Sequence, residues 1–521
     1  MVWIGFRLGS NAALDESTHT RRGVGKSIAK GALWTLSIRL VSRSISVVST
    51  LILARLLTPS DFGVYALAMS VYAFVELIRA FGFGTALIQN QDATDLHYHT
   101  AWTLHFLFSL VSSCLLYLFA PLAADLLKEP ELVSVLRFMC LLFLIDGVKN
   151  VGIINFQKHM TFDREFRFQL SIKLTGFFVA VPLAFLLRSY WAMLYGLLST
   201  SVMLVLLSYI MQPFRPRFRL DYWHELFSFS AWLQVNNVLN FFNRHIENFM
   251  VSRVAGVAAV GSLSMAKETG QLLREMAEPI NRAAFPGYAR VNKDPARLLN
   301  VFCDVMGPLM ILGFVMAVGI FSVAHLLVPT LLGAKWIHIV PLVKWLALAT
   351  LLMIMMSSTN NVLIALGRIR WATSIIVVRL TLMVIFLNLF LPVYGVLGVA
   401  YATFATLSLV LVVAYLVLRR NMGLGLRRVV YILYKPGLAA LAMFLLVNGL
   451  FPAHWVGEPM PWQLAQLFAA VAVGGICFFL VLGFLWVLES RPEGPEMQLV
   501  RLVHTRTGLL SFLLPGGSPH G

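Results

Sequence analysis

Residues 395–417 read GVLGVAYATFATLSLVLVVAYLV, an apolar run without a single charged side chain. A helix of about 20 such residues is long enough to cross the hydrocarbon core of a bilayer. The rest of the 521-residue chain has the same character, since 59% of its residues are hydrophobic and only 12% are charged. Soluble domains carry about 25% charged residues. The composition therefore excludes a soluble enzyme, a disordered protein and a nucleic-acid-binding domain.

Windows of similar length recur from one end of the chain to the other, and together they predict an all-α integral membrane protein with about 14 transmembrane helices. Short connections separate them, several marked by Pro or Gly. The two most polar windows are 225–250 and 257–287. The windows are 31–57, 62–85, 99–120, 132–156, 167–187, 190–211, 225–250, 257–287, 299–331, 338–366, 371–391, 395–417, 434–451 and 464–489.

The distribution of basic residues predicts the orientation of these helices. Lysine and arginine concentrate in the cytoplasmic connections of membrane proteins. With the N-terminus placed in the cytoplasm, 24 of the 41 lysines and arginines fall on the cytoplasmic side and 4 on the opposite side. A wrong number of spans would scramble this alternation. The split therefore favours the predicted number of spans and predicts that both termini are cytoplasmic. The run 31–57 is too long for a signal-peptide core and is predicted to be a retained span.

A weak internal repeat predicts the domain organisation. Arg55 and Gly63 recur as Arg253 and Gly261, at an offset of 198 residues. A second echo places Asn150 and Lys158 at 210 residues before Asn360 and Arg368. Together the two echoes predict two homologous six-helix lobes around a central cavity, an arrangement found in transporters. The predicted divisions are a cytoplasmic N-terminal segment (1–30), an N-lobe (31–211), a C-lobe (225–417), two added C-terminal helices (434–489) and a cytoplasmic tail (490–521).

Several short segments are distinctive as a set. Residues 53–67 read LARLLTPSDFGVYAL, and FGFGTALIQ, FPGYAR, LGAKW, ALGR and YGVLGVA follow at 81–89, 285–290, 332–336, 365–368 and 394–400. In this order they resemble the polysaccharide transporter family of oligosaccharide flippases, which includes lipopolysaccharide and exopolysaccharide biosynthesis proteins. That family belongs to the superfamily of multidrug, oligosaccharidyl-lipid and polysaccharide exporters. The resemblance runs from about Lys30 to Arg420, and its motifs are interpreted as structural.

The resemblance implies a function and a location. It implies alternating access between two six-helix bundles in the bacterial cytoplasmic (inner) membrane. The implied cargo is a polyprenyl-pyrophosphate-linked oligosaccharide, moved to the periplasmic leaflet for surface polysaccharide synthesis. Membrane lipids, a polysaccharide polymerase and glycosyltransferases are the implied partners. A small-molecule exporter of the same superfamily and a membrane polymerase or glycosyltransferase remain alternatives.

Thirteen basic residues fall inside the predicted spans, where a charge at the bilayer centre costs about 2.5–3.5 kcal/mol. Arg39 and Arg43 lie one helical turn apart on one face, and two guanidinium forks suit a diphosphate. Snorkelling to the interface is the alternative for this pair. Two other basic residues have acidic neighbours at i, i+3 spacing, and Glu76–Arg79 and Asp146–Lys149 are therefore predicted to be local helix pairs.

Polar faces on windows 225–250 and 257–287 predict a cavity lining, because lipid does not tolerate so many amides and charges. Internal i, i+4 ion pairs are the alternative. A coupling-cation site built from Asn236, Asn240 and Glu247 is a further possibility. The predicted substrate-binding residues are Arg39, Arg43, Lys173, Asn236, Asn240, Arg244, Lys267 and Arg274.

The remaining motifs point to no enzyme chemistry. GxxxxGK[ST], HExxH and GxSxG patterns are missing from the sequence, so no nucleotide motor, metalloprotease or serine hydrolase site is predicted. His97, His99 and His105 have the form H-x-H-x5-H, but the first two are expected at the cytoplasmic mouth as ordinary solvated histidines. Neither a cofactor nor a metal is predicted, apart from the coupling cation considered above.

Overall fold

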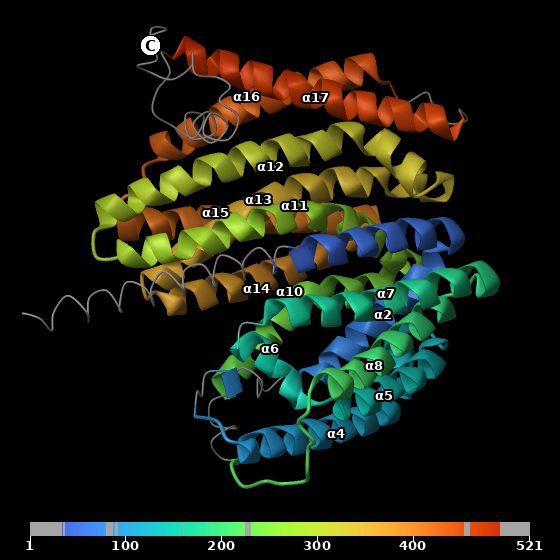
Figure 1. Cartoon of the computed structure of the whole chain (residues 1–521). Helices are drawn as coiled ribbons and strands as arrows, with labels where there is room; N and C mark the ends of the chain where they lie inside the picture. Colours follow the sequence, from blue (N-terminus) through green and yellow to red (C-terminus); the bar gives the residue numbers. More distant parts are fainter. Residues whose placement is uncertain are drawn as a thin grey trace, which may run out of the picture. The chain divides into compact units, whose positions relative to one another are not determined.

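The computed structural model describes residues 34, 37–79, 87–88, 92–159, 161–223, 231–452 and 459–489. Every regular element within these ranges is a helix (Figure 1). The chain divides into two compact units, of which unit 1 comprises 1–58 with 68–238 and unit 2 comprises 59–67 with 239–521. Two helices, α2 (Pro59–Glu76) and α10 (Ala231–Ala255), therefore contribute residues to both units.

Unit 1 is built from antiparallel helix pairs. Its first helix covers Ser37–Leu56, and α4 packs along α5 just as α7 packs along α8. Long apolar side chains on these helices point outward, with 71% of Leu118 and 79% of Leu186 exposed, as expected for a surface that faces lipid. The numbered elements after α2 are α4 (Asp95–Leu127), α5 (Leu132–Gly147), η1 (Val151–Ile154), α6 (Asn155–Lys158), α7 (Phe162–Leu187) and α8 (Trp191–Met211).

The predicted span 132–156 is wrong at its C-terminal end, because α5 stops at Gly147 and a turn follows. Fully buried Asn150 fixes that turn. Its side-chain carbonyl accepts from the backbone N–H of Gly152 (2.9 Å), and its amide donates to the carbonyl O of Phe214 (2.6 Å). A side chain that bonds to nearby backbone in this way competes with helix continuation. The 3-10 turn η1 and short α6 replace the last part of the predicted helix.

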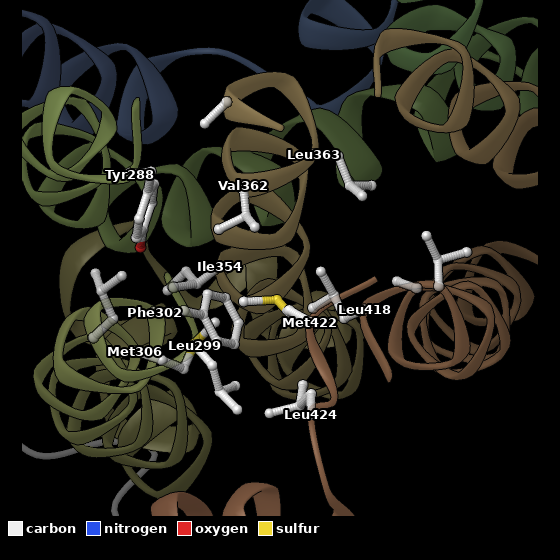
Figure 2. Close-up of a cluster of buried hydrophobic side chains, with 14 of the residues drawn as sticks. Tyr288, Leu299, Phe302, Met306, Ile354, Val362, Leu363, Leu418, Met422 and Leu424 are labelled. Carbon is white, nitrogen blue, oxygen red and sulfur yellow. The ribbon is translucent and has the colours of Figure 1, made fainter. Parts of the chain in front are cut away.

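Unit 2 packs its helices around a continuous apolar core (Figure 2). Tyr288, Phe302, Ile354 and Leu418 come from four different helices and meet in this cluster. The last two helices, orange to red in Figure 1, lie along α12 through a second cluster that includes Phe478. The elements are α11 (Val257–Arg290), α12 (Pro295–Leu331), η2 (Ala334–Ile339), α13 (Val340–Ala365), α14 (Ile369–Tyr394), α15 (Val396–Met422), α16 (Leu426–Leu450) and α17 (Met460–Leu488).

Ten helices among the described residues are long and apolar enough to cross a membrane, which makes the chain a multi-pass membrane protein by length and composition. The other four predicted windows coincide with α2, α5, α10 and α11, which are shorter or more polar. The count of fourteen spans therefore stays a prediction. The predicted N-terminal segment 1–30 and tail 490–521 lie outside the described residues.

Two glycines hold the start of α2 against the start of α11 within unit 2. A Cβ on Gly63 would overlap the carbonyl O of Val257, and a Cβ on Gly261 would overlap that of Pro59. Pro59 and Val257 are separated by 198 residues, as are Gly63 and Gly261, so the contact is reciprocal at the offset of the sequence repeat. The two glycines that recur in the sequence therefore lie at one helix crossing, and the repeat of whole lobes stays a prediction.

Candidate functional site

The basic residues predicted in the N-terminal half differ in their exposure. Arg39 is exposed on the first helix, whereas Arg43, one turn further, is partly buried with its Nε and one Nη enclosed. The start of this helix lies near α7, because the Trp34 ring lies 5.1 Å from the ring of Phe166. Lys173 is partly buried on α7. The two arginines therefore differ in access, since Arg39 is exposed and part of the Arg43 head group is shielded.

The residues predicted in the C-terminal half do not all remain free cations. Lys267 on α11 forms an ion pair with Glu247 on α10, and Glu247 is buried at 7% exposure. A carboxylate this close neutralises most of the charge that Lys267 could offer to an anionic ligand. Arg244 is exposed and Asn240 is half-buried on α10. The side chains of Asn236 and Arg274 lie outside the described residues.

These placements divide the predicted site between the two units. Arg39, Arg43 and Lys173 belong to unit 1, whereas Asn240 and Lys267 belong to unit 2. That all of them line one cavity stays a prediction.

The structure joins the two predicted local pairs into a single ion cluster in unit 1. Arg79 lies 2.8 Å from Glu76, and Lys149 Nζ lies 3.1 Å from Asp146 Oδ2, which confirms both i, i+3 pairs. Arg79 also pairs with Asp146, and His105 Nε2 lies 3.5 Å from the same carboxylate. We call Glu76, Arg79, His105, Asp146 and Lys149 the N-lobe ion cluster. The i, i+3 spacing predicted the two local pairs, but no sequence pattern predicted the link between them.

Most of the side chains in the N-lobe ion cluster are largely buried. The side chains of Arg79, Asp146 and His105 are 8%, 13% and 14% exposed. The ring of Phe143 covers one side, with the Arg79 guanidinium carbon 5.3 Å from its centroid and Tyr72 stacked on it at 4.2 Å. Removing one partner from a buried ion pair costs far more than removing both, because a bare charge remains.

The other two histidines of α4 anchor the segment that follows α8. His97 stacks on Tyr222 with ring centroids 3.9 Å apart, and Nδ1 of His99 accepts from the backbone N–H of Arg217 at 3.0 Å. Thr103 accepts from the N–H of Arg219 in the same way. Across the described part of the chain, no group of three His, Cys, Asp or Glu residues could hold a metal ion.

Two of the distinctive sequence motifs, 53–67 and 332–336, meet at the start of α2 in unit 2. The Phe62 ring packs edge to face on fully buried Trp336 at 5.6 Å. Nε2 of His338 lies 2.9 Å from Oγ of Ser262 on α11. The segments 53–67 and 332–336 are therefore packing motifs, as interpreted from the sequence.

Comparisons with known proteins agree on one family and one fold. The model of the polysaccharide biosynthesis protein family matches residues 52–341. The chain is 25% identical over 350 residues to the teichuronic acid biosynthesis protein TuaB of Bacillus subtilis (strain 168), covering 66% of this chain and 72% of that protein. It is 24% identical over 460 residues to the succinoglycan biosynthesis transport protein ExoT of Rhizobium meliloti (strain 1021), covering 87% and 92%.

Among solved structures, the lipid II flippase MurJ in an inward closed conformation shares the fold. The TM-score is 0.71 at 13% sequence identity, and the match covers 88% of this chain and 100% of that one.

Proposed function

Because the chain belongs to the family of polysaccharide biosynthesis proteins, we propose that it is a flippase for polyprenyl-pyrophosphate-linked oligosaccharides. It moves them across the bacterial cytoplasmic membrane by alternating access and supplies surface polysaccharide synthesis. One observation carries the proposal: a chain of this family adopts a fold that covers the whole of a lipid II flippase. The relative that it matches over 87% of its length is named as a succinoglycan biosynthesis transport protein.

The pyrophosphate is bound by guanidinium groups of the first helix. Arg39 is exposed on this helix, and partly buried Arg43 lies one turn away. Arginine stays charged and binds phosphate oxygens in a bidentate manner, so this pair suits a diphosphate. Lys173 on α7 adds a third positive charge in the same unit.

The glycan and the lipid tail need different surfaces. Amide side chains on α10, Asn236 and Asn240, hydrogen-bond sugar hydroxyls, and Arg244 and Arg274 contribute positive charge. Lys267 contributes through its pair with Glu247 rather than as a free cation. The prenyl chain stays in the bilayer, against the exposed apolar side chains of the helices.

The finer architecture is part of the same proposal. We propose fourteen spans with both termini in the cytoplasm, as six-helix lobes at 31–211 and 225–417 followed by the added pair at 434–489. A helix overlaps each predicted window, which supports this count. The protein acts without an enzymatic step and alongside the polymerase and glycosyltransferases that build and consume its cargo.

Variants of the first helix test the assignment of the diphosphate site. Arg43→Ala should reduce surface polysaccharide by at least about tenfold, because a charge-assisted bond worth roughly 1.5–3 kcal/mol is lost. Arg39→Ala should act in the same direction. The measurement is polysaccharide yield and accumulated lipid-linked intermediate in a deletion strain that expresses each variant at equal level. Arg167→Ala is the matched control, because Arg167 is 73% exposed on α7. Full activity of both variants would remove these two arginines from the site.

A further inference from the structure

His105 is the member of the N-lobe ion cluster whose side chain can take up a proton, because a neutral imidazole has one nitrogen without a hydrogen. Its Nε2 donates to the backbone carbonyl O of Asp146 at 3.2 Å, which leaves Nδ1 as the nitrogen that takes up a proton. The same Nε2 lies 3.5 Å from the Asp146 carboxylate. A protonated His105 would therefore have a counter-ion already in place.

Two permanent cations compete for that counter-ion. Arg79 and Lys149 both pair with Asp146, the same carboxylate that lies 3.5 Å from His105. Glu76 also belongs to the cluster, where it binds Arg79 at 2.8 Å. With Arg79 and Lys149 in place, one carboxylate already serves two positive charges. A third positive charge becomes favourable when one of these cations leaves.

Arg79 directly follows a helix that both units share. The first residues of α2, 59–67, belong to unit 2 and are held there by the crossing of Gly63 with α11. Its last residues belong to unit 1, where Arg79, three residues past Glu76, ties the chain to Asp146 at the end of α5. A change in the position of α2 relative to α5 would thus be resisted at the ion cluster.

We propose that His105 and Asp146 form a proton-binding site in which a proton on His105 replaces Arg79 as a partner of Asp146. The proton binds Nδ1, the imidazolium pairs with the carboxylate, and Arg79 moves away with the last turn of α2 while keeping Glu76 as its partner. When Arg79 returns, the proton is released. This inference rests on the proposed flippase function, for which the site supplies coupling to a proton gradient.

Hydrogen–deuterium exchange tests the site without any substrate. In the purified full-length protein, protection of residues 74–79 should fall about tenfold between pH 7.5 and pH 5.5, after correction for the intrinsic exchange rate. A tenfold change in protection corresponds to a free-energy difference of about 1.4 kcal/mol. His105→Gln should lose this pH dependence. His99→Gln, on the same helix but outside the cluster, should keep it.

A second variant keeps the proposal testable if His105→Gln does not fold. Lys149→Gln removes one competing cation and leaves the contact of Arg79 with Asp146 in place, so the change in protection should occur about one pH unit higher than in the wild type. An unchanged pH profile in both His105→Gln and Lys149→Gln would overturn the proposal.

A transport assay distinguishes failure of the proton coupling from failure of the proposed flippase function. Proteoliposomes are loaded with radiolabelled lipid-linked oligosaccharide extracted from the producing cells, and translocation is measured with and without a gradient of one pH unit. Stimulation of up to about tenfold is expected for one coupled proton. His105→Gln should translocate without responding to the gradient. If the wild-type protein translocates the lipid but does not respond to the pH gradient, the proton coupling is refuted and the flippase function is not. If nothing is translocated at any pH, the flippase function fails, and the exchange measurement still decides the proton site.

Discussion

Lys435 is 1% exposed on α16, and its Nζ lies 2.8 Å from the carboxylate of Glu489 beyond the end of α17. The Tyr431 ring lies 5.2 Å from the same nitrogen, and Tyr434 donates to the same carboxylate. A buried ammonium needs such a counter-charge because desolvation of a bare charge costs several kcal/mol. This group of side chains fastens the last two helices to one another.

Removing the carboxylate should therefore destabilise the protein more than removing the lysine. Glu489→Gln leaves a buried positive charge and should cost about 2–3 kcal/mol, whereas Lys435→Met leaves a partly exposed carboxylate and should cost less. The measurement is the thermal midpoint of each variant in detergent. Asp163→Asn, at the exposed pair with Arg167, is the control and should change little. Equal midpoints for Glu489→Gln and the wild type would contradict this account.

Pairs between residues three apart in the sequence could be predicted, whereas pairs between distant segments could not. Glu76–Arg79 and Asp146–Lys149 follow from their i, i+3 spacing, although Arg79 and Lys149 lie just past the ends of α2 and α5. The link from Arg79 to Asp146 and the pair of Lys267 with Glu247 depend on which helices are neighbours. Hydropathy contains no such information, so the fate of the Lys267 charge was missed.

At the scale of helices, the repeat at an offset of 198 residues has a physical reason. Gly63 and Gly261 let α2 and α11 approach until backbone meets backbone, and each glycine faces the carbonyl of the other helix. Small residues permit this close approach between membrane helices. The sequence predicted the positions of most helices, but it placed the end of α5 too late because the role of Asn150 depends on distant Phe214 and Ser208.

A side chain at the helix crossing should disrupt it. Gly261→Val places carbon atoms on the carbonyl O of Pro59, and overpacking costs about 1–3 kcal/mol or more. We expect a lower thermal midpoint and reduced polysaccharide yield in cells. Gly483→Ala on α17 is the matched control, since a Cβ there meets nothing within 4 Å and Ala favours the helix. If Gly261→Val is as stable as Gly483→Ala, the backbone contact does not exist as described.

At the scale of the whole molecule, the distribution of basic residues predicts the orientation of the helices in the membrane. It predicts both termini in the cytoplasm, whereas the predicted substrate residues are distributed over two units that the sequence could not arrange in space. The helices themselves could be predicted because apolar length is a local property. Whether Arg43 and Lys267 face one cargo depends on the assembly of the lobes, which local patterns do not encode.

Cysteine labelling tests this orientation directly. In a variant with its four native cysteines replaced, Lys128→Cys and Arg188→Cys should react with a membrane-impermeant maleimide added to intact cells. Arg217→Cys and Arg427→Cys should react only after the membrane is permeabilised. The reverse pattern would invert the orientation, and labelling of all four positions in intact cells would refute the number of spans between them.

A flippase determines which leaflet holds the lipid-linked oligosaccharide. The most direct measurement depletes the protein in producing cells and tests whether the oligosaccharide is accessible to a periplasmic glycosidase. We predict that accessibility falls as the protein is lost, that intact lipid-linked units accumulate on the cytoplasmic side, and that re-expression restores accessibility. Unchanged accessibility in depleted cells that carry no second flippase would contradict the account.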